Sequence, residues 1–381
     1  MGCAASLAQP KDMDAVPTAQ SQTAAPPAPI IQAKSRWLPV PWSELPGLND
    51  DPLFEAWNAW LKSCEKPLPI FSQVCRDVRR MSISSSQEQV TWLKARLQAY
   101  RVEAPLADDP GLLTAYFEPV LQGSRTATVD FKVPLYRPPA GLALRKPWFS
   151  RKDIDTLPEA QAALKGREIA WVADAIDALV LHIQGSGRIQ LASAPGAAGA
   201  MPAAGAEQIR LAYDSTNGQA YKSVGRWLLD QNEIRDATWP GIKAWVAQNP
   251  QRLQELLWSN PRVVFFREEA VNAADSQTGP RGAQGVPLTP GRSIAVDPGS
   301  IPYGTPVWLS SPGPQISLNK LVIAQDTGSA ITGAVRADYF AGMGAEAGEL
   351  AGRLKQPLRL WVLWPRPAEK STAPAPLNTS P

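Results

Sequence analysis

The chain has 381 residues, enough for two or three domains, and 38 basic against 35 acidic side chains give it a net charge of +3. Hydrophobic residues make up 44% of the chain, which excludes a chain too polar to fold. The sequence has no run of Lys or Arg of the kind that would indicate a nucleic-acid partner. With one histidine, His182, and three cysteines, a His/Cys zinc site would need almost every candidate ligand at once. We therefore expect no metal, no other cofactor, and chemistry carried by carboxylates.

The two ends of the chain have the composition of flexible segments. Residues 1–35 are rich in Ala, Pro, Gln, Ser and Thr, and 367–381 in Pro, Ala and Ser, so we expect a flexible leader and a disordered tail. Met1-Gly2-Cys3 is similar to the end of a bacterial lipoprotein signal, in which the Cys is acylated. Either the apolar part of that signal lies upstream, or Cys3 is an unmodified thiol; Gly2 with Ser6 also fits a weak myristoylation signal. No stretch reaches the length of apolar residues that a membrane-spanning helix needs.

The first folded segment is expected to be helical. Leu53, Phe54, Trp57, Trp60 and Leu61 recur at helical spacing, and a second helix starts near residues 85 and 86, where a Ser is followed by Glu or Gln at capping-box distance. Cys64 and Cys75 are close enough in sequence to form a disulfide in an oxidising compartment, and two buried free thiols are the alternative.

After residue 112 the pattern changes to short apolar runs broken by Gly and Pro, which is typical of a β-rich body. We expect strands around 180–183, 263–266, 305–309, 321–324 and 358–364. One helix is expected at 250–258, with Asn249 as its cap and Pro250 in its first turn. His182, in the first of these runs, is interpreted as a structural histidine.

Three aspartates, Asp297, Asp326 and Asp338, each lie near the junction between an apolar run and a Gly- or Pro-rich turn. Singly, each would be a structural turn residue. Together they indicate one opening, because Gly-rich turns at strand ends let a polymer approach the backbone. The sequence therefore indicates a polymer-binding cleft lined by carboxylates.

The chain resembles the membrane-bound lytic murein transglycosylase A family, whose C-terminal segment carries a three-aspartate signature. The resemblance covers roughly residues 110–365. The residues that carry it are TAYFEPVLQGSR (114–125), HIQGSGRIQL (182–191), RLAYDSTNGQAYKSVGR (210–226), NPRVVFFRE (260–268), GAQGVPLTPGRSIAVDPGSIPYGT (282–305) and AQDTGSAITGAVRADYFAGMGAEAG (324–348).

The resemblance implies a mainly β fold with flanking helices: a double-psi β-barrel domain, a second β domain inserted into it, and a groove between the two. The barrel would take residues 36–125 and 250–366, and the inserted domain 126–249. The implied substrate is the glycan strand of peptidoglycan, cleaved by a monomer in the periplasm or at the periplasmic face of the outer membrane.

By the family pattern, Asp338 is a single acid and base, Asp326 orients or tunes it, and Asp297 supports the barrel turn. Sugar binding is assigned to Tyr116, Glu118, Gln184, Ser186 and Tyr213. The alternative for these residues is structural, with Gln184-Gly185-Ser186-Gly187 as a hairpin turn and both tyrosines in the core.

Two other functions stay open on the sequence alone. A hydrolase could use Asp326 and Asp338 as an acid and base pair. A module that binds cell-wall polysaccharide without cutting it could have the same barrel.

Overall fold

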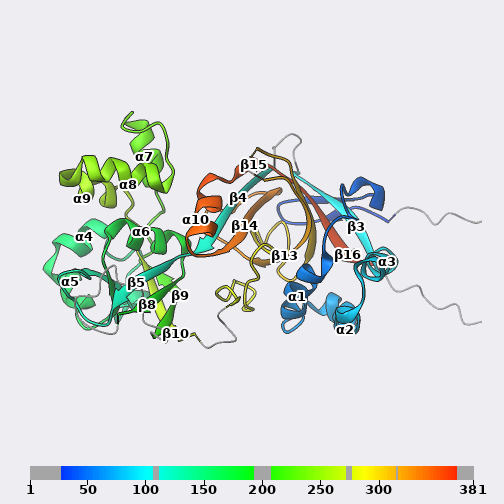
Figure 1. Cartoon of the computed structure of the whole chain (residues 1–381), viewed down its shortest axis with the longest axis horizontal. Helices are drawn as coiled ribbons and strands as arrows, with labels where there is room; N and C mark the ends of the chain where they lie inside the picture. The colour runs from blue at the N-terminus through cyan, green and yellow to red at the C-terminus, as the bar shows by residue number, and fades with distance from the viewer. Residues whose placement is uncertain (1–26, 106–110, 193–206, 272–276, 315, 367–381) are drawn as a thin grey trace, which may run out of the picture.

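The computed structural model describes residues 27–105, 111–192, 207–271, 277–314 and 316–366. Cys3, most of the predicted leader and the whole predicted tail lie outside these residues. The described strands form one sheet of ten strands and one of six, in two lobes (Figure 1). The predicted mainly β architecture with flanking helices and a second β domain is therefore confirmed. Among the described helices, none has both the length and the apolar character that a membrane crossing requires.

The larger sheet joins strands from both ends of the chain, and its centre curls into a nearly closed six-strand barrel. β11 runs parallel to β13, and β14 runs parallel to β4, two pairings that require long connections. In spatial order its strands are β1 (Ile30–Ile31), β2 (Arg36–Pro39), β3 (Leu97–Glu103), β16 (Arg359–Pro365), β12 (Pro306–Ser311), β13 (Leu318–Asp326), β11 (Ser293–Val296), β14 (Arg336–Met343), β4 (Leu112–Glu118) and β15 (Lys355–Pro357).

Helices α1 (Leu53–Ser63), α2 (Ser72–Arg80) and α3 (Ser86–Arg96) pack on the barrel lobe, and α10 (Gly344–Arg353) packs on β4 and β14. Short 3-10 turns occupy Trp42–Glu44, Pro69–Phe71 and Met81–Ile83. The predicted helix over residues 53–61 is confirmed as α1. The predicted capping box is confirmed at Ser85, whose side chain accepts from the Glu88 N–H while Glu88 accepts from the Ser85 N–H.

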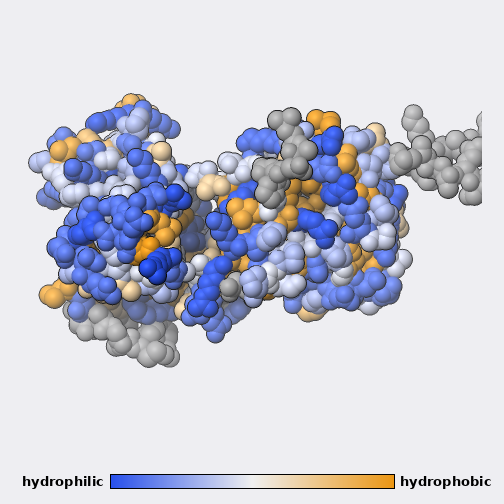
Figure 2. All heavy atoms as spheres, turned by 90° about the horizontal axis from the view of Figure 1, so that it is seen from above, coloured by the Kyte–Doolittle hydropathy of each residue, from blue (hydrophilic) through white to orange (hydrophobic). Residues whose placement is uncertain are grey.

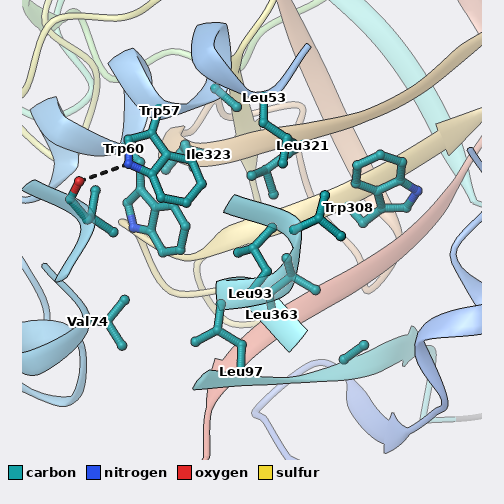
Figure 3. Close-up of a cluster of buried hydrophobic side chains, with 14 of the residues drawn as sticks. Leu53, Trp57, Trp60, Val74, Leu93, Leu97, Trp308, Leu321, Ile323 and Leu363 are labelled. Carbon is teal, nitrogen blue, oxygen red and sulfur yellow. Dashed lines mark hydrogen bonds between the residues drawn. The ribbon is translucent and has the colours of Figure 1, made fainter. Parts of the chain in front are cut away.

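The apolar face of α1 fills the core beneath the barrel. Trp57 and Trp60 are fully buried against Leu321 and Ile323 of β13 (Figure 3). The Trp57 indole N–H donates to the Val78 carbonyl at 2.9 Å, so its polar atom is satisfied inside the core. This packing fixes α1 against the strand that ends at Asp326.

Cys64 and Cys75 form a disulfide that ties the end of α1 to α2. Both residues are buried, at 1% and 2% exposure. The first of the two alternatives for this pair is confirmed. Such a bond stabilises the fold because it constrains the unfolded chain.

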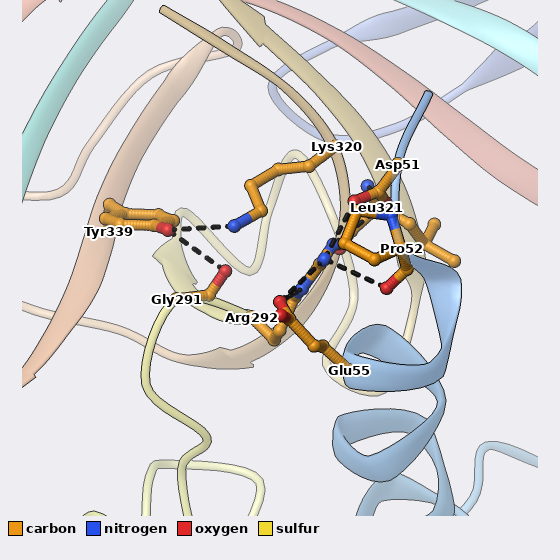
Figure 4. Close-up of polar contacts among 8 residues, drawn as sticks. All are labelled: Asp51, Pro52, Glu55, Gly291, Arg292, Lys320, Leu321 and Tyr339. Atoms are coloured by element: carbon orange, nitrogen blue, oxygen red, sulfur yellow. Dashed lines mark hydrogen bonds and ion pairs between the residues drawn. The ribbon is translucent and has the colours of Figure 1, made fainter. Parts of the chain in front are cut away.

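Arg292 holds the first turn of α1 to the strands of the barrel (Figure 4). Its buried guanidinium donates to the two carboxylate oxygens of Asp51 at 2.8 and 2.7 Å and to Glu55 at 2.8 Å. Asp51 also accepts from the Leu321 N–H of β13 at 2.8 Å. In the same cluster, the Tyr339 hydroxyl of β14 donates to the Gly291 carbonyl at 3.0 Å. The first turn of α1 is thus fixed relative to β13 and to Arg292, which precedes β11.

The second lobe is built on the smaller sheet. Its strands, in spatial order, are β10 (Val264–Ala270), β9 (Gln208–Thr216), β8 (Gly187–Leu191), β5 (Val120–Ser124), β7 (Glu168–Val172) and β6 (Val133–Tyr136). Its helices are α4 (Arg151–Thr156), α5 (Pro158–Leu164), α6 (Ala175–Gln184), α7 (Val224–Asp230), α8 (Trp239–Gln248) and α9 (Leu253–Ser259), with 3-10 turns at Leu142–Leu144 and Pro250–Arg252.

The predicted strand at 180–183 is wrong, because these residues belong to helix α6. The Asp174 side chain caps this helix by accepting from the N–H groups of Ile176 and Asp177. A helix that is buried over most of its surface gives the same apolar run as a buried strand. His182, on this helix, accepts from the Val264 N–H at 3.0 Å through Nδ1, and burial lowers its pKa, which fits the predicted structural role.

The predicted helix at 250–258 is confirmed in part. A 3-10 turn occupies 250–252 and the α-helix begins at Leu253. Asn249 does not cap it with its side chain, which instead donates to the Trp245 carbonyl of the preceding helix at 2.9 Å. The predicted strands near 263–266, 305–309, 321–324 and 358–364 correspond to β10, β12, β13 and β16.

Two predicted boundaries differ from the structure. The predicted leader of 1–35 extends too far, because Ile30 and Ile31 pair with β2 and Lys34 forms an ion pair with Asp297 at 2.8 Å. The smaller sheet includes β5 and β10, which lie outside the predicted insertion at 126–249. By sheet membership, the chain therefore leaves the barrel after Glu118 and returns to it at Ser293.

Candidate active site

Two of the three predicted aspartates lie in one row across the barrel. Ala295 of β11 is in register with Asp326 on β13 and with Asp338 on β14. Residues in register on neighbouring strands project from the same face, and two strand spacings separate the two Cα atoms by about 10 Å. The small side chain of Ala295 lies between the two carboxylates. Thr114 of β4, in register with Asp338, extends the row.

Asp338 is half-buried and is bonded to Thr114. The Thr114 hydroxyl donates to Asp338 Oδ1, and the Arg336 guanidinium donates to Thr114 Oγ1 at 2.8 Å. Burial raises the pKa of Asp338, while the Thr114 hydrogen bond and the positive charge of Arg336 oppose that rise. The net direction is upward, which favours the protonated acid.

Asp326 ends β13 and has donors on both carboxylate oxygens. The Tyr116 hydroxyl donates to Oδ2 at 2.9 Å, and the Ala283 N–H donates to Oδ1 at 2.9 Å. Burial raises the pKa of Asp326 to about 6, against the effect of these donors, and the nearby Asp338 charge also raises it. Two carboxyl groups with raised pKa values, on one face and in electrostatic contact, can hold and release a proton near neutral pH.

Asp297 has a different environment. Its carboxylate accepts from Lys34 Nζ at 2.8 Å and from the N–H groups of Gly333 and Gly299 at 2.9 and 3.0 Å. Burial alone would raise its pKa, but the three donors outweigh burial and lower the pKa of Asp297. Such a group stays ionised and holds the turns that follow β11 and precede β14.

Asp297→Asn is expected to lower the free energy of unfolding by about 1–2 kcal/mol at pH 7, because the charged acceptor of buried N–H groups is lost. The pKa of Asp297 is lower in the folded protein than in the unfolded chain, so its contribution is present above about pH 4 and is lost as the pH falls through the folded pKa. Urea denaturation at pH 7 and at pH 2.5 measures both. An equal destabilisation at the two pH values would contradict this assignment.

Three of the predicted sugar-binding residues lie together on the second lobe. Gln184 ends α6, Gly185 turns the chain at φ 79°, and the chain enters β8 at Gly187, so this segment is a helix-to-strand turn rather than a hairpin. Tyr213 of β9, 46% exposed, has its ring beside Gly185, and Ser186 is buried at 8% exposure. Gln184 Oε1 accepts from the Phe117 N–H at 3.1 Å, which joins this turn to β4.

Tyr116 and Glu118, both on β4, are placed differently. Tyr116 reaches the carboxylate of Asp326, whereas Glu118 is fully buried. Glu118 accepts from Arg188 Nε at 2.9 Å and from Arg210 Nε at 2.7 Å. Both arginines also donate to the Thr278 carbonyl at 2.7 Å. Glu118 therefore fits a structural role better than sugar binding, because its oxygens face two buried guanidinium groups.

The site lies where β4 leaves the barrel for the second lobe (Figure 1). In Figure 2 the surface is hollowed between the two lobes. Within the part of the chain that the structure describes, no group of three or more His, Cys, Asp or Glu side chains is placed to hold a metal ion.

Three groups that contact the aspartates or their partners were not predicted from the sequence: Thr114, Arg336 and the Ala283 N–H. Thr114 is two positions before Tyr116, so strand alternation would have placed both on one face. Arg336 is likewise two positions before Asp338 on β14. The Ala283 N–H carried no signal, because its role depends on a loop whose partner is 43 positions away in the sequence.

Comparison with known proteins extends these observations. Residues 112–267 match the family described as the MltA specific insert domain, and residues 292–364 match the 3D domain. Membrane-bound lytic murein transglycosylase A of Escherichia coli K12 is 31% identical over 282 residues, which cover 70% of this chain and 69% of that protein. The protein of the same name from Vibrio cholerae is 30% identical over 282 residues, with coverage of 68% and 69%.

Solved structures of related proteins are similar to this chain as well. The lytic transglycosylase LtgG of Burkholderia pseudomallei is 41% identical, with a TM-score of 0.60 and coverage of 87% of this chain and 96% of that chain. MltA of Neisseria gonorrhoeae is 28% identical, with a TM-score of 0.73 and coverage of 90% and 95%. Escherichia coli MltA with bound chitohexaose, 24% identical with a TM-score of 0.65 and coverage of 83% and 91%, shares the fold. The fold class predicted from the sequence is confirmed by these likenesses.

Proposed function

The chain belongs to the membrane-bound lytic murein transglycosylase A family, and from this we propose that it cleaves the β-1,4 bond between N-acetylmuramic acid and N-acetylglucosamine, leaving a 1,6-anhydromuramoyl end. The observation that carries the proposal is the row of Asp326, Ala295 and Asp338, with both carboxyl groups partly withdrawn from water. No water is consumed, because the C6 hydroxyl of the muramoyl sugar attacks its own C1.

In this reaction one carboxyl group acts twice. Asp338, protonated, gives its proton to the glycosidic oxygen as the C1–O bond breaks. As a carboxylate it then takes the proton of the C6 hydroxyl while the C6 oxygen bonds to C1. The proton count closes, because Asp338 begins and ends the cycle protonated, ready for the next strand. Asp326 stays close by and tunes the proton affinity of Asp338 through its charge.

Asp338 is the better candidate for this role because fewer donors hold it. Both oxygens of Asp326 accept hydrogen bonds. Among the described residues, only Thr114 donates a hydrogen bond to Asp338. Asp338 is half-buried, so a glycan that covers it removes its remaining water and raises its proton affinity further. The rest of the site supplies orientation and excludes water.

For substrate binding we propose Gln184, Ser186 and Tyr213 of the second lobe and Tyr116 beside Asp326. Tyr213 offers an exposed aromatic face of the kind on which a sugar ring stacks. The substrate is the glycan strand of peptidoglycan, bound by a monomer in the periplasm or at the periplasmic face of the outer membrane. An acylated Cys3 is the proposed anchor.

One observation favours a second candidate, a hydrolase. The pKa of Asp326 is raised to about 6, so Asp326 could serve as the acid while Asp338 activates a water molecule. Such an enzyme would add water to the cleaved bond. The two reactions share residues and differ in their products.

Digestion of purified peptidoglycan in ¹⁸O-labelled water, followed by mass spectrometry of the muropeptides, separates the candidates. The transglycosylase yields anhydro ends that are one water lighter than reducing ends and carry no label. Reducing ends with ¹⁸O at C1 would establish the hydrolase. Sedimentation with insoluble peptidoglycan but no soluble product would leave a binding protein.

A further inference from the structure

A loop that belongs to neither sheet covers Asp326. Residues 279–288 fold back on themselves, with Arg281 and Pro287 in a β-bridge, between the second lobe and β11. At Gly282 the loop is so close to the end of β13 that a Cβ would lie 2.5 Å from the Gln325 carbonyl and 3.2 Å from Asp326 Cβ. The next residue supplies the Ala283 N–H that donates to Asp326.

The side chain of Gln284 fastens this loop to the end of α1. Its Oε1 accepts from the Ser63 hydroxyl at 2.8 Å, and its Nε2 lies 3.3 Å from the Ser63 carbonyl and 3.2 Å from the Lys66 carbonyl, to which it donates. Its backbone N–H donates to the Gln325 carbonyl at 3.0 Å. Both polar atoms of the Gln284 side chain and its backbone N–H are therefore hydrogen-bonded.

Ser63 also connects to β13 directly. Its hydroxyl oxygen accepts from Gln325 Nε2 at 2.7 Å, and Gln325 also donates to the Ala59 carbonyl at 2.9 Å. Gln325 is fully buried and precedes Asp326 in the chain. Two glutamines, one on each side of the Ala283 to Asp326 hydrogen bond, are thus held by one serine of α1.

We propose that Gln284, held by Ser63, is a positioning residue that keeps the Ala283 N–H directed at the Asp326 carboxylate. The inference rests on the proposed function only for its effect on the reaction; the effect on Asp326 itself does not require it. Loop 279–288 has no hydrophobic anchor at Ala283, which is exposed, so the neighbouring Gln284 contacts fix this position.

The groups that face Asp326 are few. Tyr116 approaches from β4, Asp338 from β14, and Tyr303 from the turn between β11 and β12, and the Thr327 N–H is a second backbone donor beside Ala283. Among the described residues, no Lys or Arg forms an ion pair with Asp326. Loss of the Ala283 N–H donor is therefore not offset by a nearby cation, and the protonated, neutral form of Asp326 becomes more favourable.

Full-length protein labelled with ¹³C at the Asp carboxyl carbons tests this by NMR titration, with Asp326→Asn identifying the Asp326 signal. In Gln284→Ala the titration midpoint of Asp326 is expected to rise by about one pH unit. With peptidoglycan, kcat is expected to fall about tenfold with KM unchanged, since binding residues on the second lobe are untouched.

Ser63→Ala removes the hydroxyl that donates to Gln284 Oε1, while the bonds from Gln284 Nε2 to backbone carbonyls remain, and it gives a second test if one variant folds poorly. Gln122→Ala is the matched control: it removes a side-chain bond to Gln190 of 2.6 Å in the smaller sheet and should leave the Asp326 midpoint unchanged. An unchanged midpoint in both folded Gln284→Ala and Ser63→Ala would overturn the inference. Absence of anhydro products from the wild type would instead overturn the proposed function, and the titration would still decide the positioning role.

Discussion

Asp338→Asn is expected to lower kcat for release of muropeptides by about three orders of magnitude while the affinity for peptidoglycan stays within about twofold. The amide has the shape of the acid and can still accept from the Thr114 hydroxyl, so the local structure is retained. It cannot donate a proton to the glycosidic oxygen or accept one from the C6 hydroxyl. Turbidity loss of a peptidoglycan suspension and a sedimentation assay measure the two quantities.

Asp326→Asn is the informative comparison. Its expected loss in kcat is about tenfold to a hundredfold, because it removes a tuning charge and leaves the acid in place. If Asp326→Asn were instead inactive and Asp338→Asn retained most of the activity, the roles of the two residues would have to be exchanged. Full activity in both variants would remove the carboxylates from the mechanism.

Glu118→Gln is expected to reduce the free energy of unfolding by about 3–5 kcal/mol, because it removes the buried negative charge that faces the guanidinium groups of Arg188 and Arg210. The Glu118 side chain is fully buried, and those of the two arginines are exposed by only 5% and 6%. Urea denaturation monitored by tryptophan fluorescence measures the change.

Glu255→Gln provides the matched control on the surface. Glu255, with a side chain 51% exposed, pairs with Arg252 at 2.8 Å, and its loss is expected to leave the free energy of unfolding nearly unchanged. A Glu118→Gln protein as stable as the wild type but with a raised KM would show that Glu118 binds sugar. Loss of stability with an unchanged KM in the folded fraction assigns it to the fold.

How far the sequence could predict this fold is clearest from its correct and incorrect elements. Helix α1 was predictable because its apolar residues recur with a single period, and α3 because Ser85 and Glu88 form a local capping box. The run at 180–183 was assigned to a strand because α6 is apolar on most sides. Ile30 and Ile31 could not be distinguished from the leader, since two residues carry no period.

The candidate site shows the same division between local and long-range information. Asp326 and Asp338 were predictable from turn residues and from the family resemblance, because both signals lie within a short stretch. Their hydrogen-bond partners were not, since Tyr116 and Thr114 lie 210 and 224 positions away in the sequence. Glu118 is part of the same family block as Tyr116, and only the structure shows that its carboxylate faces two arginines.

The pairing of β3 with β16 has a consequence for the order of assembly. Strand β3 is flanked by β2 and β16 alone, and the register joins Arg101 to Trp361, near the end of the described residues. During synthesis β3 therefore emerges from the ribosome long before its partner β16 exists, and all strands of the smaller sheet are made in between. The nascent chain must keep this barrel edge unpaired until β16 has been synthesised, which makes closure of the barrel a late step of folding.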